Sequence, residues 1–385
     1  DRKPTKTKQT SMVLIPNSTY SIPLRFEVSR SDLITNGVSW PSSSLSHFDE
    51  TLRTAWQSRL DAGLFRYPLR SSPLSRVLSP PHDVRFPFVA QLNPERSSER
   101  RPPQRFASVQ QPFDHEAFHF GRIPCREVLF ELRVHDYLVI NVSPLEFGHV
   151  LLLPQPGRLL CQALSSRAVR LALRTLLLSA HPGFRVGFNS LRACASVNHL
   201  HLHAYYLEHR LPVEWMKLSV IPGLRAAIPL RLALPPASPI PSFAVSVHPE
   251  EPGALKKLTD IVCEVVQLMA QCEIAHNVMF TRGEETTTAR CMVSMVRAFI
   301  WPRKSSPETK NLGAFNVALC ELAGHLPVSS REHFDMLCWN DAATALKDQA
   351  LSEQDFALLQ KDVVKLLNNF VALAMMKKNV CKIVM

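Results

Sequence analysis

The chain has 385 residues, of which 46% are hydrophobic. This is enough for one large domain or two ordinary domains with a substantial core, and it excludes an intrinsically disordered chain. The formal net charge of +11 at pH 7 favours contact with anions such as ligand phosphates, nucleic acid or an acidic membrane surface, although a basic solvated surface is equally common.

The cysteines and the N-terminal segment indicate an intracellular setting. Nine cysteines are scattered from Cys125 to Cys381 without a C-x-x-C pair, which suggests neither a zinc ribbon nor a disulfide framework. The opening DRKPTKTKQT lacks the apolar core of a secretion signal, and no apolar run approaches the roughly 20 residues of a membrane span. We therefore expect a soluble cytoplasmic protein. Because the first residue is Asp1 and not Met, the natural start of the chain is left open.

The first half of the chain predicts a regular order of strands and one helix after an irregular start. Residues 1–81 predict an irregular arm with an amphipathic helix within 48–67, and residues 88–106 join a short strand to an Arg-rich loop. Strands are predicted at 127–134, 136–144, 148–154, 181–190 and 197–207, with a helix at 162–180. The order is β-β-β-α-β-β, and the short loop between the second and third strands favours antiparallel pairing.

A similar order returns in the second half, after a proline-rich connector. Strands are predicted at 243–247, 276–283 and 296–304, a helix at 253–272, another strand within 314–328 and helices from 330 onward. The second half therefore reads as a degenerate copy of the first. The predicted organisation is an N-terminal arm (1–81), a first half (82–221), a connector (222–241) and a second half with C-terminal helices (242–385).

Three histidines alternate with leucines in the stretch NHLHLHAYYLEHR, residues 198–210. Side chains along a strand alternate between the two faces, so the leucines fall on one face and the imidazoles of His199, His201 and His203 on the other. A helix would scatter the same residues around its axis, and the two tyrosines that follow favour a strand. The sequence therefore predicts a row of imidazoles on one face.

Three kinds of chemistry compete for this row. An H-x-H pair on a strand can supply two zinc ligands, but no well-spaced Cys or His pair elsewhere completes such a site. A purely structural role is weaker, because adjacent imidazoles repel when charged and are costly to bury without partners. Nucleophilic catalysis, in which the middle imidazole attacks phosphorus while its neighbours bind the phosphate, is the interpretation that we favour.

The motif H-L-H-L-H resembles that of the histidine triad superfamily. The wider string GFRVGFNS and SVNHLHLHAYYLEHRLPVE is similar to animal GDP-D-glucose phosphorylases, which are related to plant GDP-L-galactose phosphorylases. Further stretches that resemble that family are AGLFRY, FVAQLN, VINVSPLEFGHVLL, EIAHN, TRG and AFNVALCELAGHLPV. The resemblance runs with gaps from Ala62 to Val328.

The resemblance implies an α+β fold of the galactose-1-phosphate uridylyltransferase type, with two histidine-triad-like halves of antiparallel sheet and packed helices. It also implies a nucleotidyltransferase reaction, in which GDP-D-glucose and phosphate give GDP and glucose 1-phosphate. By position His201 is then the nucleophile, which becomes guanylylated. His199 and His203 are expected to donate hydrogen bonds to the phosphate oxygens.

Further site residues follow from the uridylyltransferase branch. Asn189 and Ser196 lie where that branch has phosphate-contacting Asn and Ser, although both residue types are also common in turns. The loop ERRPPQ resembles an Arg-Pro-Gln segment near the phosphates, so Arg100, Arg101 and Gln104 are expected there.

The chain also departs from the pattern of the phosphorylases. Arg192 and Ala193 stand in the loop where glycine is usual, and Ala204 replaces a glycine after the motif. Arg192 either adds a phosphate contact or obstructs the pocket. A cysteine pair that helps to bind a structural metal in some uridylyltransferases is absent, so we expect no metal and no cofactor.

Two other functions stay open at this stage. A triad-type hydrolase would use water in place of phosphate in the second step, and a basic protein that binds RNA without catalysis would need aromatic stacking positions that the sequence does not display. The expected partners are GDP-D-glucose and phosphate, with no nucleic acid and no membrane. The preferred hexose, the residues that recognise guanine and the oligomeric state are not predicted.

The nucleophile also implies a pH dependence. His201 must be neutral to attack, so the first step should fade below the ordinary imidazole pKa of about 6.5, or lower if charged neighbours depress it.

Overall fold

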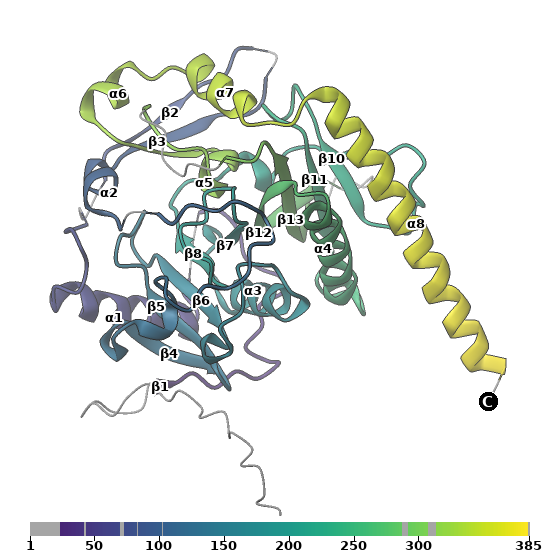
Figure 1. The fold of residues 1–385 in the computed structure, drawn as a ribbon, viewed down its shortest axis with the longest axis horizontal. Helices are drawn as coiled ribbons and strands as arrows, with labels where there is room; N and C mark the ends of the chain where they lie inside the picture. The colour runs from purple at the N-terminus through teal and green to yellow at the C-terminus, as the bar shows by residue number, and fades with distance from the viewer. Residues whose placement is uncertain are drawn as a thin grey trace, which may run out of the picture.

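The computed structural model describes residues 24–41, 44–69, 73–82, 84–101, 103–286, 292–306 and 313–383, with side chains after Ala372 left aside. The described strands form one eleven-stranded sheet and one three-stranded sheet (Figure 1). Helices pack on both faces of the large sheet, which confirms the predicted α+β class.

The large sheet contains two copies of one motif. The first copy consists of β4 (Val128–Arg133), β5 (Asp136–Ile140), β6 (Val150–Pro154), α3 (Ser166–Leu178), β7 (Phe184–Asn189) and β8 (Leu202–Tyr206). The second consists of β9 (Ser219–Val220), β10 (Leu230–Ala233), β11 (Ser242–Val247), α4 (Ala254–Gln271), β12 (Ala275–Thr286) and β13 (Met292–Arg303). The strand order is β1-β4-β5-β6-β8-β7-β12-β13-β11-β10-β9, so the copies meet where β7 pairs with β12.

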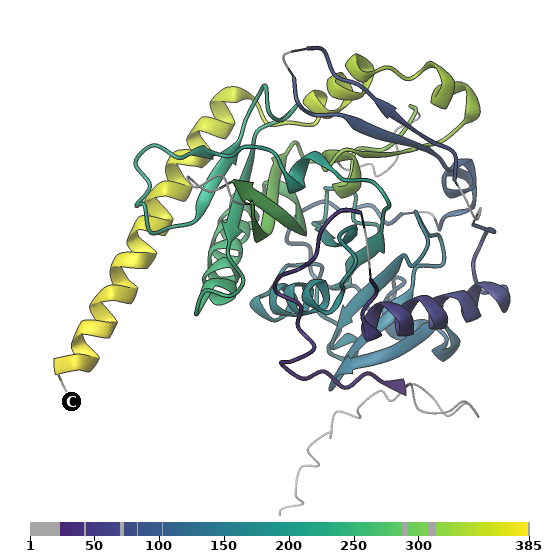
Figure 2. The same cartoon turned by 180° about the vertical axis from the view of Figure 1, so that it is seen from behind.

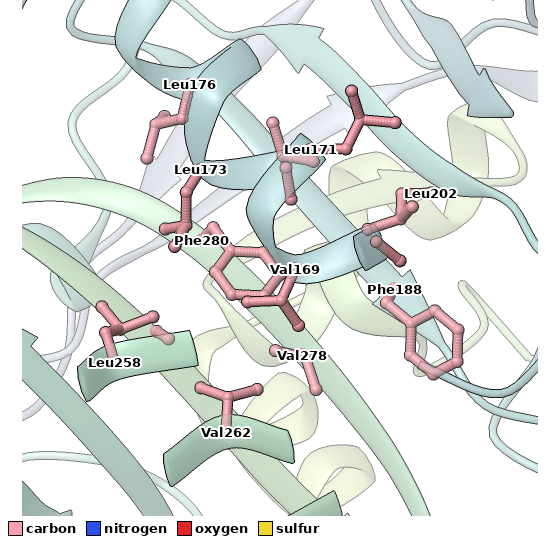
Figure 3. Packing of buried hydrophobic residues seen from close by; sticks show 14 of the residues in the cluster. Val169, Leu171, Leu173, Leu176, Phe188, Leu202, Leu258, Val262, Val278 and Phe280 are labelled. Atoms are coloured by element: carbon pink, nitrogen blue, oxygen red, sulfur yellow. The ribbon is translucent and has the colours of Figure 1, made fainter. Parts of the chain in front are cut away.

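The two copies share one apolar core on the helical face of the sheet. Leucine and valine side chains of α3 and α4 point onto apolar side chains of β7, β8 and β12, as Figure 3 shows. The two helices also contact each other. Since each helix is apolar on one side only, burying both stripes against a single continuous sheet joins the halves into one body.

The opposite face of the large sheet is covered by C-terminal and N-terminal segments together. A small sheet pairs β2 (Ser75–Leu78), β3 (Phe88–Leu92) and β14 (His325–Val328), with β14 parallel to β3. Around it lie α2 (Pro94–Glu99), α5 (Leu319–Leu322), α6 (Arg331–Met336) and α7 (Trp339–Asp348). Tyr205, Phe299 and Trp301 of the large sheet pack into this second core, so residues far apart in sequence enclose the face that carries the histidines.

In its described part, the N-terminal arm confirms the predicted helix and adds a short strand that the sequence did not predict. It holds β1 (Leu24–Arg25), parallel to β4, and α1 (His47–Asp61), whose start is fixed by reciprocal bonds between Ser46 and Asp49. Asp49 is fully buried and also accepts hydrogen bonds from Ser179 and Tyr206. At the other end of the chain, α8 (Glu353–Ile383) runs along the second half and its last turns extend beyond the body (Figure 2).

Several predicted boundaries are corrected. β8 begins at Leu202 and not at residue 197, because the backbone N–H groups of Leu200 and His201 bond to Leu160 and Gln162 instead of to a neighbouring strand. The connector at 222–241 contains β10, which pairs with β11 and with the edge strand β9. The nearby prolines lie outside the strand and so remove none of its hydrogen bonds. The segment 314–328 is a strand only at its end, and the Arg-rich loop starts with α2, which Asn93 caps.

The turn that joins α3 to β7 leaves no room for a side chain at Gly183. The Gly183 carbonyl accepts a hydrogen bond from the Leu207 N–H, and a Cβ on Gly183 would lie 2.1 Å from the Leu207 carbonyl oxygen. We predict that Gly183→Ala lowers the free energy of unfolding by about 1–3 kcal/mol. Gly157→Ala is the control, because a Cβ there meets nothing within 4 Å. Urea unfolding of both variants tests this; equal midpoints would contradict it.

Candidate functional site

Gln162 clamps the backbone of the central histidine. Its Oε1 accepts from the His201 N–H at 2.9 Å, and its Nε2 donates to the carbonyl oxygens of His201 at 3.1 Å and of Asn189 at 2.9 Å. The backbone N–H of Gln162 is in turn held by the Asn198 side chain. The loop before α3 therefore fixes the point at which the histidine row enters the sheet.

The tautomer of His201 is decided by its own chain. Nδ1 lies 2.7 Å from the carbonyl oxygen of His199, which can only accept, so the proton sits on Nδ1 and Nε2 keeps a lone pair. The residue is 2% exposed, and burial lowers the pKa of His201 to about 4. At neutral pH the imidazole is uncharged and nucleophilic. The sequence predicted a pKa at or below the ordinary value, and burial favours the lower one.

His203 receives the opposite proton arrangement. The Leu145 N–H donates to Nδ1 of His149 at 2.9 Å, so neutral His149 carries its proton on Nε2, which lies 3.1 Å from Nδ1 of His203. His203 accepts there and keeps a proton on Nε2. The amide nitrogen of Asn141 also lies 3.2 Å from His149 Nε2, but the backbone N–H decides the tautomer because it can only donate. Burial holds the pKa of both imidazoles well below the ordinary value.

His199 is tied to the loops that surround the site. Its Nδ1 accepts from the Phe120 N–H at 2.9 Å, and its Nε2 therefore donates to the Pro156 carbonyl at 3.2 Å. Both ring nitrogens are engaged and the residue is 1% exposed. The sequence predicts either a phosphate donor or a support at this position. In the structure His199 holds the loop whose Phe120 ring centroid lies 4.9 Å from that of His201.

Two adjoining cavities open beside the histidines, with volumes of about 370 Å³ and about 90 Å³. Four side chains line both of them, namely Arg96, Arg100, Ser196 and His203. His201 lines the smaller cavity, whose wall combines the rings of Phe118 and Phe120 with arginine, glutamate and other polar side chains. The larger cavity is closed by the C-terminal segment around α5. The histidine row thus stands at the junction of two cavities, each with a mixed polar and apolar wall.

The junction is positively charged. Arg100 makes no hydrogen bond or ion pair with any of the described residues, and although burial lowers its pKa to about 10, it stays protonated at pH 7. Arg96 donates to the Ser143 carbonyl, and the Arg101 guanidinium lies 3.3 Å from the centroid of the Phe118 ring in the smaller cavity. A half-buried arginine that lines both cavities and forms no ion pair with the described residues is suited to bind an anion.

The remaining predicted residues divide into cavity walls and supports. Asn189 lines the larger cavity, and its Oδ1 accepts from Asn277 Nδ2 at 2.6 Å, so its own amide N–H groups are left for the cavity. Ser196 lines both cavities. Gln104 lines neither cavity; its side chain bonds to the Phe118 carbonyl and the Asn198 N–H. It acts as a support for the loop that carries Ser196.

Sequence reasoning missed the residues that hold this arrangement. Gln162, His149 and Asn277 lie in separate segments, and each contacts a predicted site residue through one or two hydrogen bonds. Two of them fall in the family-like strings VINVSPLEFGHVLL and EIAHN. That overlap was the available signal, but their contacts depend on strand register across the sheet.

Arg192 neither lines a cavity nor obstructs one. Its guanidinium donates to the carbonyls of Phe106 and Ala107 at 3.1 and 3.0 Å, outside the site. Its backbone has φ +61°, a left-handed conformation that costs a non-glycine residue roughly 1–2 kcal/mol. This explains why glycine suits the position. Ala193 and Ala204 are fully buried.

Within the described ranges, no group of three or more His, Cys, Asp or Glu side chains has a metal-binding arrangement. Nor does any helix among those residues have the length and apolar character needed to cross a bilayer.

Two family profiles match the chain. The GDPGP1-like N-terminal domain matches residues 47–205, and the GDPGP1-like C-terminal domain matches residues 242–370. The chain belongs to the GDPGP1-like family. The N-terminal match contains the histidine row and its Gln162 clamp, and the C-terminal match contains the segment that closes the larger cavity.

Curated relatives of this GDPGP1-like chain are sugar-nucleotide phosphorylases. GDP-D-glucose phosphorylase 1 of Bos taurus is 45% identical over 90% of this chain and 94% of the relative, and that of Homo sapiens is 41% identical over 95% and 98%. GDP-L-galactose phosphorylase 2 of Arabidopsis thaliana is 27% identical over 78% and 72%. The predicted family resemblance is confirmed.

A solved structure shares the fold. Yeast Ap4A phosphorylase Apa2 in complex with AMP aligns with a TM-score of 0.54 at 13% identity, over 80% of this chain and 97% of that chain. At this identity the likeness supports the fold alone.

The buried histidines of the GDPGP1-like site predict acid sensitivity. Burial lowers the folded-state pKa of His149, His199, His201, His203, His276 and His325. Below about pH 6.5 the unfolded chain takes up protons on these histidines that the folded chain does not bind. The free energy of unfolding therefore decreases as the pH is lowered, by up to about 1.4 kcal/mol per pH unit for each histidine, until the pH reaches the folded-state pKa.

Urea midpoints between pH 7.5 and 5 measure this loss. His276 lines neither cavity, and its pKa is about 4, so His276→Gln should flatten the slope by one proton. A free energy of unfolding that stays constant across this range would show that these histidines take up protons at the same pH in the folded and the unfolded chain.

Proposed function

We propose that the chain transfers GMP from GDP-D-glucose to inorganic phosphate through a guanylyl-histidine intermediate, releasing glucose 1-phosphate and then GDP. The single observation that carries this proposal is the pair of opposite tautomers at the cavity junction. Buried His201 offers a lone pair on Nε2, while His203, two residues on, offers an N–H beside the unpaired Arg100. The names of the relatives supply the substrate class.

In the first step, Nε2 of His201 attacks the α-phosphorus of GDP-glucose. The Nε2–P bond forms as the bond between that phosphorus and the bridging oxygen breaks, and the electron pair leaves on glucose 1-phosphate. The ring becomes cationic and keeps its Nδ1 proton, which the His199 carbonyl accepts at 2.7 Å. His203 and Arg100 oppose the charge that develops on the phosphoryl oxygens.

In the second step, a phosphate oxygen attacks the same phosphorus, and the Nε2–P bond breaks to give GDP and neutral His201. A protonated imidazole is a good leaving group, so the retained Nδ1 proton serves both steps. Amide and hydroxyl groups of Asn189 and Ser196 border the cavities in which the departing and the incoming phosphate would bind. The rings of Phe118 and Phe120 in the smaller cavity offer stacking surfaces that suit the guanosine side.

Product analysis separates phosphorolysis from hydrolysis. With phosphate present, GDP should accumulate in step with glucose 1-phosphate; GMP formed at the same rate with or without phosphate would assign water as the acceptor. The scattered cysteines are the basis for a cytoplasmic location, and no nucleic acid or membrane partner is part of the proposal.

We predict that His201 carries the covalent adduct. Incubation with GDP-glucose alone should add one guanylyl group, detected by intact mass and located by peptide mapping, and His201→Ala should abolish both adduct and turnover. His203→Gln should slow adduct formation by about 10²–10³, the usual effect of removing one transition-state donor. His276→Gln, which changes a buried histidine outside the cavities, is the matched control. An adduct on another residue would overturn the mechanism.

The buried nucleophile also predicts an unusual acid limb. Because the pKa of His201 is about 4, the rate of adduct formation should change little from pH 7.5 to about 5 and fall below that, once the imidazole takes a proton. Stopped-flow pH jumps measure the rate before the protein unfolds, with circular dichroism as the control for folding. A tenfold loss per pH unit that begins at pH 6.5 would indicate a solvated imidazole instead.

A further inference from the structure

The larger cavity contains a buried phenol without a protein partner. Tyr205 is 1% exposed and lines this cavity, and its hydroxyl makes no hydrogen bond with any of the described residues. Burial raises the pKa of Tyr205 well above its ordinary value, so the hydroxyl stays protonated and can both donate and accept. Since an unmet buried hydroxyl is costly, a polar ligand group is the partner that this position suits.

A buried carboxylate lines the same cavity. Glu321 of α5 is 5% exposed, and its Oε2 accepts from the Ala318 N–H at 2.8 Å. A carboxylate offers about four lone-pair sites, so acceptor capacity is left for a ligand. Burial raises the pKa of Glu321, and the Cys320 thiol and the nearby Arg96 oppose this rise only in part. Arg303 donates hydrogen bonds to the Val317 carbonyl and to the Gln349 side chain, and Arg100 lines both cavities at their junction.

The direction of the reaction assigns this cavity to the leaving group. In phosphoryl transfer the nucleophile and the leaving oxygen stand on opposite sides of phosphorus. His201 borders the smaller cavity, whereas His203, Arg100 and Ser196 border both, so the phosphates lie at the junction and the leaving group extends into the larger cavity. On the same face of β8, Tyr205 follows His203 by two residues and therefore lies one step further into that cavity.

We propose that the larger cavity binds the hexose of the sugar nucleotide, and that Tyr205 and Glu321 select it by hydrogen bonds to its hydroxyl groups. A hexose offers several hydroxyls that can each donate to a carboxylate and accept from a phenol. The strand that carries the histidines thereby also contacts the sugar through Tyr205, and the C-terminal segment contributes Glu321. This inference rests on the proposed function.

The test compares donors with and without a hexose. In wild type, adduct formation on His201 is measured with GDP-glucose, with its C2 epimer GDP-mannose, and with GDP, from which the enzyme would expel phosphate in the reverse of the second step. Tyr205→Phe should lower kcat/KM for GDP-glucose about three- to tenfold, and Glu321→Gln by about tenfold or more, as for lost neutral and charged hydrogen bonds. Both variants should narrow the ratio between GDP-glucose and GDP-mannose.

Adduct formation from GDP should stay within about twofold of wild type in both variants, because GDP has no hexose to contact. Tyr206→Phe is the matched control: it removes the neighbouring hydroxyl, which bonds to Asp49 on the other face of the strand, and should lower stability without altering hexose preference.

Three outcomes would overturn the inference. If the ratio of kcat/KM between GDP-glucose and GDP-mannose is unchanged in both variants, these residues do not contact the sugar. A loss of adduct from GDP equal to that from GDP-glucose would make these residues structural. A changed preference between GDP-glucose and ADP-glucose, with the hexose ratio constant, would show that the cavity holds the base. By contrast, a wild-type protein that forms no adduct from any donor would refute the proposed function itself.

Discussion

The carbonyl oxygen of His199 fixes the reactive state of the site, because it takes the proton on Nδ1 of His201 and leaves the lone pair on Nε2. That bond depends on a bend in the chain just before β8, where Gln162 holds both the N–H and the carbonyl of His201. A regular strand would send those backbone groups to neighbouring strands instead. The departure from strand geometry at residues 198–201 is therefore part of the chemistry.

The arrangement also separates the nucleophile from the positive charge of the site. The imidazoles are buried deeply enough to stay neutral, so they do not repel one another, and the positive charge at the junction comes from arginine. Arginine keeps its charge when half-buried, whereas histidine gives its charge up. The site can thus hold an anion firmly and still present an uncharged nucleophile to it.

The duplicated architecture divides the labour between the halves. The two copies form one sheet through the β7–β12 pair, where Asn277 of the second copy orients Asn189 of the first. The strand of the second copy that corresponds in order to β8 is β13, and on the cavity-side face it carries Phe299 and Trp301 in place of histidines. Only the first copy carries the histidine row; the second supplies packing and holds Asn189, and the segment that follows it lines the larger cavity.

The sequence by itself determined the elements with strong periodicity. The β-β-β-α-β-β order, its weaker second copy and the face of the histidines follow from alternation and helical spacing, which are local properties. The strings around the triad were specific enough to indicate the family. The same reasoning extended β8 too far, to residue 197, because a backbone hydrogen bond to a distant side chain leaves no periodic pattern in the sequence. It also overlooked β10, which is short and lies within a proline-rich segment.

Tertiary structure alone decided the proton positions of the individual imidazoles. His199, His201 and His203 look alike in the motif, yet Phe120 and His149 leave the protons of His199 and His203 on Nε2, whereas the His199 carbonyl holds that of His201 on Nδ1. These partners come from loops and strands up to 79 residues away in the chain. The tautomer of an imidazole and its pKa depend on what surrounds it after folding, and a linear pattern cannot specify those contacts.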